Sequence, residues 1–254
     1  MRLRTVRVEN YRCLGAVVVD MAELTALVGP NSAGKSSLRL PVVADKLPET
    51  ERADPRAYLA RTFSEHFREA FFAKGVLLVE GPTDVAIFEA SARLLGLKDL
   101  AADGIVVTHV GGKGSQPIAL AILDALGIPT FCVFDGDAGA ADGTPCETCG
   151  RARSDRTSAI KSNQRILAAL GAPAADFPVT TVDAHWACFY SEIEDAISGL
   201  VPLLDAVGAE MGWKGKSPEV YAEAVRRAGA GSLPSEIRSI IEQTRSLAGL
   251  DAVT

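Results

Sequence analysis

The sequence has none of the features that mark membrane or secreted proteins. No apolar run approaches the roughly 20 residues that a helix needs to cross a bilayer, and residues 1–9 alternate basic and apolar side chains without a signal-peptide core behind them. The five cysteines are an odd number at scattered spacing, so they predict no disulfide framework. We therefore expect a cytoplasmic protein without a membrane partner, with Cys13, Cys132 and Cys188 as reduced core thiols.

Neither the histidines nor the cysteines complete a metal site in the sequence. His66, His109 and His185 do not share the spacing of metal ligands. Cys146 and Cys149 form one C-x-x-C pair, but no second pair and no nearby pair of histidines supplies the other ligands of a zinc site. Whether this pair binds zinc stays open.

Charge is distributed unevenly along the 254 residues, which carry a net charge of −6. The first 75 residues have 12 basic and 9 acidic side chains, whereas the remaining 179 have 14 basic and 23 acidic ones. An acidic part of this size argues against binding to nucleic acid unless some of its carboxylates bind divalent cations, which invert the local field.

Proline and glycine divide the chain into three parts. Two short strands, expected at residues 2–9 and 16–28, lead into the glycine-rich stretch GPNSAGKSS. Prolines at positions 41, 48 and 55 then interrupt any helix. We place an N-terminal segment at 1–50, a connecting helix and linker at 51–74, and the main domain at 75–254.

The main domain is predicted to be α/β, with a parallel β-sheet flanked by helices. Strands and helices alternate from residue 75, which predicts right-handed β-α-β units. The expected strands are 76–80, 105–110, 130–135 and 178–182, and the expected helices are 84–95, 117–126 and 155–170, followed by helices near 191–205, 217–229 and 234–247.

The stretch GPNSAGKSS fits the P-loop pattern G-x-x-x-x-G-K-[ST], between a strand and a helix. Its backbone N–H groups would bind phosphates, Lys35 would reach the outer phosphates and Ser36 would ligate magnesium. ATP is the expected ligand, and the alternative is a glycine turn that binds nothing. The predicted nucleotide-binding residues are Gly29, Asn31, Gly34, Lys35, Ser36 and Ser37.

Carboxylates follow two of the predicted strands. Glu80 ends VLLVE and Asp84 starts the next helix, while Asp135 ends FCVFD and Asp137 follows it. Because the carboxyl ends of parallel strands face one edge of a sheet, these four acids can converge there. Like charges so close are unfavourable unless cations neutralise them, and hard oxygen ligands suit Mg²⁺ or Mn²⁺, here two ions. The alternative is that one strand end serves a P-loop ATPase as its magnesium-binding acid.

These segments resemble a known family. VEGPTD, followed about 50 residues later by DGD, is similar to the Toprim domain of topoisomerases, primases and several nucleases. Together with LTALVGPNSAGKSS, HVGGKGS, LGIPTFCVFDGD and SEIEDAI, it resembles the OLD (overcoming lysogenisation defect) family of ATPase-Toprim nucleases. The Toprim resemblance covers about residues 70–225 and the ATPase resemblance about residues 1–40, as a partial ABC-type segment. An ABC signature, a separate Walker B strand and a dimerisation arm are missing, so ATP turnover by this chain alone is not expected.

The resemblance implies a metal-dependent endonuclease that nicks or cleaves DNA. It implies Glu80, Asp84, Asp135 and Asp137 as metal ligands, with Glu194 as the first choice and Glu192 as the second for the family's third acidic segment. Its late lysine matches Lys216, with Lys214 as the alternative, and would stabilise charge on the phosphate. The alternative for the third acidic segment is an ordinary solvated helix face, and the alternative for Lys216 is an ordinary surface lysine. The catalytic residues are then Glu80, Asp135 and Lys216.

DNA is the expected partner, and two basic segments could contact its backbone. Lys113 follows a strand within HVGGKGS, and Arg151, Arg153, Arg156, Lys161 and Arg165 lie in a stretch with one acid. The alternatives are a plain left-handed glycine turn for the first segment and a solvated helix for the second. Water is the expected attacking group, and a covalent route through Tyr190 is the alternative. A homodimer or a separate ATPase or helicase partner stays open, and so does the other function class, a P-loop regulatory module or ATPase without nuclease activity.

Overall fold

The computed structural model describes residues 5–11, 14–20, 65–97, 100–141, 156–213 and 217–250. The chain divides into two compact units, Met1–Pro55 and Arg56–Thr254. In the first unit, strands β1 (Thr5–Tyr11) and β2 (Leu14–Asp20) form an antiparallel hairpin. Both strands were predicted, and the P-loop residues 29–37 lie outside the described ranges.

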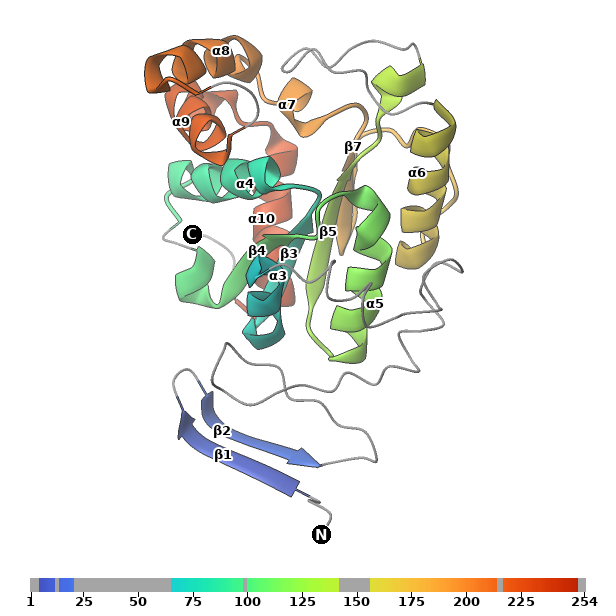
Figure 1. Ribbon diagram of the computed structural model, residues 1–254, viewed down its shortest axis with the longest axis vertical. Helices are drawn as coiled ribbons and strands as arrows, with labels where there is room; N and C mark the ends of the chain where they lie inside the picture. Colours follow the sequence, from blue (N-terminus) through green and yellow to red (C-terminus); the bar gives the residue numbers. More distant parts are fainter. Residues whose placement is uncertain are drawn as a thin grey trace. The chain divides into compact units, whose positions relative to one another are not determined.

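The second unit is built on a five-stranded sheet with the order β4-β3-β5-β7-β6. Neighbouring strands are parallel except for β6, which runs antiparallel to β7. Figure 1 shows this sheet with helices on both sides, and the predicted α/β class is confirmed. The strands are β3 (Gly75–Val79), β4 (Ile105–His109), β5 (Thr130–Asp135), β6 (Thr181–Val182) and β7 (Trp186–Phe189).

Helices connect and cover the strands close to the predicted positions. Within the described ranges every helix is too short or too polar to span a bilayer. The helix expected near 191–205 is two helices, because Gly199 adopts a left-handed φ of 77° between them. The helices are α3 (Glu65–Glu69), α4 (Pro82–Leu94), α5 (Gln116–Ala125), α6 (Arg156–Leu170), α7 (Ile193–Ala196), α8 (Leu200–Met211), α9 (Pro218–Ala228) and α10 (Ser235–Leu247).

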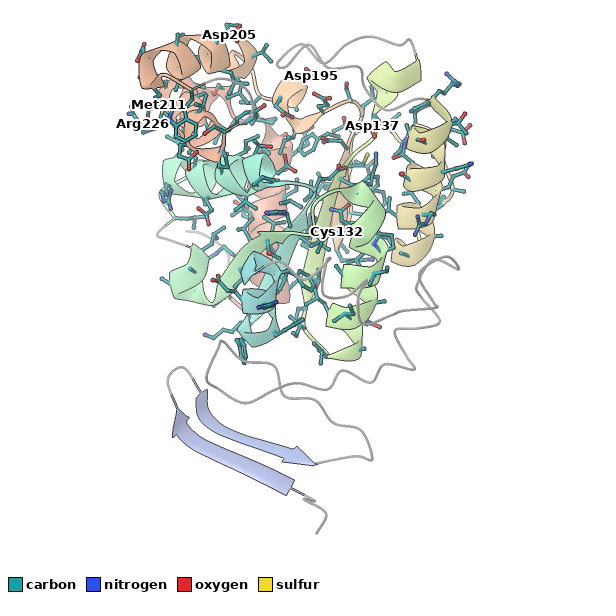
Figure 2. The ribbon with its side chains drawn as sticks, viewed as in Figure 1. Cys132, Asp137, Asp195, Asp205, Met211 and Arg226 are labelled. Carbon is teal, nitrogen blue, oxygen red and sulfur yellow. The ribbon has the colours of Figure 1, made fainter. Side chains whose placement is uncertain are left out.

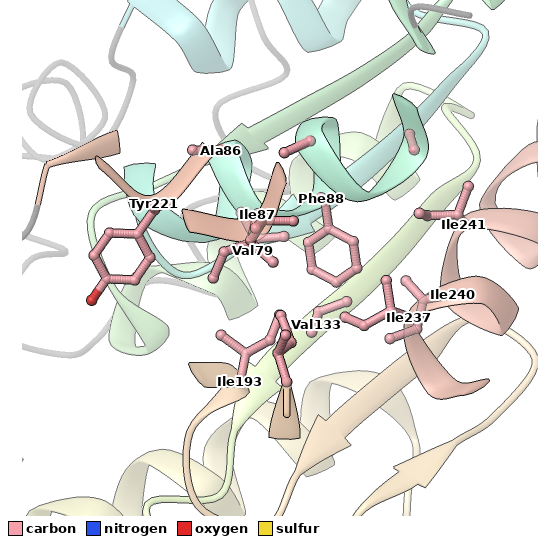
Figure 3. Packing of buried hydrophobic residues seen from close by; sticks show 14 of the residues in the cluster. Val79, Ala86, Ile87, Phe88, Val133, Ile193, Tyr221, Ile237, Ile240 and Ile241 are labelled. Atoms are coloured by element: carbon pink, nitrogen blue, oxygen red, sulfur yellow. The ribbon is translucent and has the colours of Figure 1, made fainter. Parts of the chain in front are cut away.

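Both faces of the sheet are buried, because alternate residues along each strand point to opposite sides. Leu77, Val79 and Val133 pack with residues of α4, α9 and α10, and Figure 3 shows Phe88 and Ile240 in this layer. The next residues along the strands, such as Val76, Leu78, Cys132 and Phe134, pack with residues of α3, α5 and α6. The faces are closed by side chains, so polar chemistry in the sheet is left to the ends of the strands.

Strand β7 is the main difference from the sequence-based prediction. The sequence predicted one strand at 178–182 and none at 186–189. In the structure β6 keeps only two residues, and β7 pairs with β5 from Cys132↔Trp186 to Asp135↔Phe189. Trp186–Phe189 is only four residues long and has no β-branched side chain, so its pattern alone does not indicate a strand. Because β7 lies parallel to β5, the segment after residue 189 begins at the edge of the sheet where the parallel strands end.

Candidate active site

The ends of β3 and β5 are joined through a carboxylate. Glu80 directly follows β3, and Asp135 is the last residue of β5. The backbone N–H of Asp135 donates a hydrogen bond to Glu80 Oε1 over 2.9 Å. The two acids predicted at neighbouring strand ends therefore lie together at one edge of the sheet.

Asp84 is held at the start of helix α4. The helix begins at Pro82, and the backbone N–H of Gly81 donates to Asp84 Oδ2 over 2.8 Å. A carboxylate in the first turn also interacts favourably with the helix dipole. Asp84 thus has a structural role as a helix cap. It is also close enough to the site for its charge to act on Asp135, and its side chain is 9% exposed.

The turn after β5 is packed tightly against the segment after β7. The N–H groups of Gly136, Asp137 and Ala138 donate to the carbonyl oxygens of Phe189, Ser191 and Tyr190, over 2.6, 3.2 and 3.1 Å. A Cβ atom at position 136 would lie 2.5 Å from the oxygen of Tyr190, so only glycine fits. Asp137 then adopts a φ of 54°, and Figure 2 labels it near the carboxyl end of β5.

The third acidic segment reaches the same edge. The backbone N–H of Ile193 donates to Asp135 Oδ1 over 3.1 Å, which ties the start of α7 to the end of β5. Glu194 is 1% exposed, and its Oε1 accepts a hydrogen bond of 3.1 Å from the hydroxyl of Tyr221. The charge of Glu194 acts on Asp135. Glu192 is only half-buried, so the geometry favours Glu194.

Two polar residues of the site were not predicted in their roles. Lys113 is 6% exposed, and its ammonium donates to Asp135 O, Asp137 Oδ2 and Asn163 Oδ1 over 2.5, 2.6 and 2.8 Å. Asn163, on the inner side of α6, donates to the carbonyl oxygens of Gly136 and Asp176. The sequence suggested a phosphate contact for Lys113, whereas its side chain points into the protein. The strand-glycine-glycine-lysine spacing indicated that Lys113 matters, but no local signal distinguished Asn163.

Burial and the charges of neighbouring acids shift Glu80 and Asp135 towards their neutral forms. The pKa of Glu80 is raised to about 7: burial is the main cause and the charge of Asp137 adds to it, while the charge of Lys113 and the N–H of Asp135 oppose the shift. The pKa of Asp135 is raised well above its usual range, first by burial and then by the charges of Glu80, Asp84, Glu194 and Asp137. The edge therefore carries more negative charge than its surroundings stabilise.

The donor set suits a hard divalent cation in chemistry, but it is not arranged as a ready ligand set. Carboxylate oxygens are the ligands that Mg²⁺ and Mn²⁺ prefer, and a cation would relieve the repulsion that raises the two pKa values. In the ranges that the structure describes, however, no three Asp, Glu, His or Cys side chains form a group that could hold a metal ion. Instead, each of the five acids of the edge has one carboxylate oxygen that already accepts a hydrogen bond from the protein. These acids are Glu80, Asp84, Asp135, Asp137 and Glu194.

Several predicted residues lie outside the described ranges. They are the P-loop residues, Cys13, the cysteine pair at 146 and 149, the basic residues Arg151 and Arg153, and the two candidate lysines at 214 and 216. Of the basic stretch, Arg156, Lys161 and Arg165 lie on α6 with exposed side chains, and Arg156 stacks over the ring of Phe177 at 5.1 Å. Helix α6 thus has an outer basic face, while Asn163 on its inner side belongs to the site.

Comparisons with known proteins support the family resemblance. Residues 71–137 match the family model for the Toprim domain of overcoming lysogenization defect (OLD) protein-like sequences, a nuclease-type family, which confirms the resemblance inferred from the sequence. Residues 1–39 match the AAA ATPase domain. No curated protein matches the sequence significantly.

Solved structures similar to this chain include C-terminal regions of OLD proteins. The region from Xanthomonas campestris pv. campestris is 18% identical with a TM-score of 0.47, and the comparison covers 70% of this chain and 98% of that one. The region from Burkholderia pseudomallei is 20% identical with a TM-score of 0.47, and covers 70% of this chain and 99% of that one.

Proposed function

We propose that this chain, which carries an OLD-like Toprim domain at residues 71–137, is a metal-dependent endonuclease that nicks or cleaves DNA. The observation that carries the proposal is the convergence of acids at one sheet edge. Glu80 and Asp135 are joined by a hydrogen bond, and the charges of Asp84, Asp137 and Glu194 all act on Asp135. Burying so many carboxylates is unfavourable unless a cation belongs among them.

Mg²⁺ or Mn²⁺ is the proposed cofactor, with Glu80, Asp135 and Glu194 as the carboxylates that would hold it. A divalent ion stabilises the negative charge that develops on phosphate during phosphodiester hydrolysis. Because the pKa of Glu80 is about 7 without metal, binding of a cation should release a proton near neutral pH. The backbone N–H of Ile193 and the hydroxyl of Tyr221 hold the carboxylates of Asp135 and Glu194 in place.

Water is the proposed attacking group, and Lys216 is the proposed cation that assists the phosphate. The water oxygen forms a bond to phosphorus, the bond from phosphorus to the leaving sugar oxygen breaks, and the proton of the water passes to solvent. Tyr190, which is 51% exposed, is the side chain that a covalent route would use. Replacing it by phenylalanine should leave cleavage intact and yield no DNA linked to protein; loss of cleavage would favour the covalent route.

DNA is the proposed substrate, and the outer face of α6 is the proposed contact with its backbone. Arg156, Lys161 and Arg165 are exposed on this helix, and the helix contains no acid. None of the three forms an ion pair with a described residue, whereas Arg226 and Arg227 on α9 are paired with Glu223. Exposed cations that form no ion pair within the described ranges are available for phosphate groups.

The proposal is tested by conversion of supercoiled plasmid to nicked and linear forms with Mg²⁺ or Mn²⁺ and without ATP. Asp135→Asn keeps the size of the side chain and removes its charge, so it should abolish cleavage. Asp205→Asn, at an exposed position of α8, is the matched control and should cleave like the wild type. Equal cleavage by Asp135→Asn and the control would show that the edge is not the active site.

A second candidate is a nucleotide-binding regulatory module, which the AAA ATPase match over residues 1–39 favours. ATP would bind at the P-loop, and cleavage would need a second copy of the chain or a separate ATPase or helicase. Binding of ATP that is lost in Lys35→Ala, with no cleavage under any metal, would support this function. Cleavage without ATP by Lys35→Ala would instead place the nuclease activity in the Toprim part alone.

A further inference from the structure

Tyr190 is an aromatic residue that stays exposed at the carboxyl edge of the sheet. It directly follows β7 and is 51% exposed. Its backbone is held from two sides, because its N–H donates to Thr180 Oγ1 over 3.0 Å and its carbonyl oxygen accepts from the N–H of Ala138 over 3.1 Å. Ala138 directly follows the D-x-D motif Asp135–Asp137. The ring of Tyr190 is therefore carried by fixed backbone beside the proposed active site.

A second exposed apolar side chain lies next to Tyr190. The antiparallel ladder of β6 and β7 ends with the pair Thr181↔Cys188, and Val179 and Tyr190 are the residues two positions beyond it. The two segments stay together past this pair, as the hydrogen bond between Tyr190 and Thr180 shows. Val179 is 67% exposed. Exposed apolar residues are ordinary when they are scattered, but this apolar pair lies at a proposed active site, which indicates a binding surface.

Helix α6 leads towards the apolar pair. The helix packs alongside β7 (Figure 1), and Nε2 of His185, just before β7, lies 3.4 Å from the carbonyl oxygen of Leu170, the last residue of α6. Asn163, midway along the helix, donates to the carbonyl oxygen of Gly136 at the carboxyl edge. The helix therefore runs opposite to β7, and its first residue, Arg156, lies on the side of the carboxyl edge.

Arg156 connects the basic face of α6 with the apolar pair. Its guanidinium stacks over the ring of Phe177 at 5.1 Å, and Phe177 lies two positions before Val179. Arg156 is exposed, as are Lys161 and Arg165 further along the helix. A DNA strand whose phosphates lie on these cations would therefore pass close to the apolar pair and reach the carboxyl edge.

An exposed aromatic ring next to phosphate contacts suits a nucleobase. Every base has a π-face that can stack on a tyrosine ring, while neighbouring cations hold the phosphates of the strand. In an intact duplex the adjacent bases cover these faces, so a base must leave the stack to reach a ring of the protein. A base that stacks on Tyr190 would therefore belong to DNA that is opened locally.

We propose that Tyr190, with Val179 beside it, is a stacking site for an unpaired base next to the phosphate that is cut. The inference rests on the proposed endonuclease function and adds a substrate class to it, DNA that is locally unstacked at the cut. Stacking uses the ring of Tyr190 and not its hydroxyl, which separates this role from a covalent route through the same residue.

The test compares two single strands of equal length, oligothymidylate and a sugar-phosphate strand without bases. Fluorescence anisotropy in the presence of a chelator gives the Kd of each strand for the full chain. Wild type should bind oligothymidylate about 5- to 100-fold more tightly, as stacking of a base on an aromatic ring predicts. Tyr190→Ala should lose this preference but bind the strand without bases like the wild type, because the phosphate contacts are kept. Tyr190→Phe retains the ring and should retain the preference.

Phe72→Ala is the matched control. Phe72 is 46% exposed and precedes β3, so it lies at the amino end of the sheet, away from the acids. This variant should keep the preference for oligothymidylate. A preference retained by Tyr190→Ala, or lost in Tyr190→Phe, would overturn the inference, and so would a wild type that binds both strands equally. If Tyr190→Ala does not fold, Tyr190→Leu decides in the same assay, since it has an apolar side chain without a ring.

Cleavage is measured separately, so the inference and the function on which it rests can fail independently. A wild type that prefers oligothymidylate but leaves plasmid intact with Mg²⁺ or Mn²⁺ would overturn the endonuclease function and leave Tyr190 as a stacking site for DNA. A wild type that cleaves plasmid but shows no preference for bases would overturn the inference alone. No binding of either strand and no cleavage would overturn both.

Discussion

The backbone N–H of Asp135 donates a hydrogen bond to the carboxylate of Glu80, although the two residues are 55 positions apart. This bond joins the ends of two parallel neighbouring strands. It also places two half-buried acids side by side: the charge of Glu80 raises the pKa of Asp135, and the backbone N–H of Asp135 lowers the pKa of Glu80. The protonation state of Glu80 therefore affects the hydrogen bond that joins the two strand ends.

Glu80 should make the stability of the metal-free protein depend on pH. Because the pKa of Glu80 rises from 4.5 to about 7 on folding, the folded chain binds more protons in this window. The stabilising effect is complete below about pH 4.5 and is lost as the pH rises through about 7. Glu80→Gln mimics the neutral form, so its free energy of unfolding should gain on that of the wild type between about pH 5 and about pH 8.

Urea unfolding in the presence of a chelator measures this difference at both pH values. When the free energies of unfolding of the two proteins are subtracted at each pH, the contributions of groups that titrate in both proteins cancel. A difference between wild type and Glu80→Gln that is the same at both pH values would contradict a raised pKa at Glu80.

Gly136→Ala should destabilise the fold. The added Cβ would lie 2.5 Å from the carbonyl oxygen of Tyr190 and 3.0 Å from that of Phe189, and both belong to backbone that is hydrogen-bonded to the turn. We expect a loss of about 1–3 kcal/mol in the free energy of unfolding, typical of overpacking against rigid backbone. Gly114→Ala, where no atom lies within 4 Å of the added Cβ, is the control and should be close to the wild type by urea unfolding.

Charge reversal on α6 should weaken DNA binding. Lys161→Glu with Arg165→Glu replaces two proposed phosphate contacts with repelling charges, so the affinity should fall at least about tenfold and its salt dependence should become shallower. Arg93→Glu with Arg238→Glu makes the same change in net charge at exposed, ion-paired positions of α4 and α10. Fluorescence anisotropy over several salt concentrations would measure both doubles, and equal losses would mean that net charge alone matters.

Tyr221→Phe should weaken metal binding while the fold is kept. Tyr221 is 2% exposed, and its hydroxyl donates to Glu194 Oε1. Groups that orient a metal ligand typically change metal affinity by about 10–100-fold, so the Kd for Mn²⁺ should rise by about tenfold or more. Tyr190→Phe removes an exposed hydroxyl and serves as the control in calorimetry. An unchanged Kd would show that Glu194 does not ligate the ion.

The sequence allowed the central strands and the acids of the edge to be predicted. Strands β3 and β5 are continuous apolar runs, as expected where both faces of a parallel sheet are covered. Each ends next to a carboxylate, and the rule that parallel strands end at one edge was enough to bring Glu80 and Asp135 together. The structure places them as expected, because this inference needs only the order and direction of the strands.

The residues that were missed act through partners far away in the sequence. Lys113 follows a glycine pair like a loop lysine, and only its contact with Asn163, 50 positions later, shows that it points inward. Tyr221 lies on a helix whose apolar spacing indicates packing, and nothing local indicates its bond to Glu194. Strand β7 is defined by its pairing with β5 rather than by its own residues. Local patterns carry no information about such tertiary contacts.

The contacts that form the site span long stretches of the chain, which ties it to the order of folding. The bonds between Glu80 and Asp135, Lys113 and Asn163, and Asp135 and Ile193 bridge 55, 50 and 58 positions. Closing loops of this length costs chain entropy before any contact repays it. Glu80 and Asp135 meet once β3 and β5 have paired, whereas the contacts of Ile193 and Asn163 form only when β7 has joined β5 and α6 has docked. A chain stalled before that point has the same residues but an incomplete site, so under the proposed function an unfinished copy would be inactive.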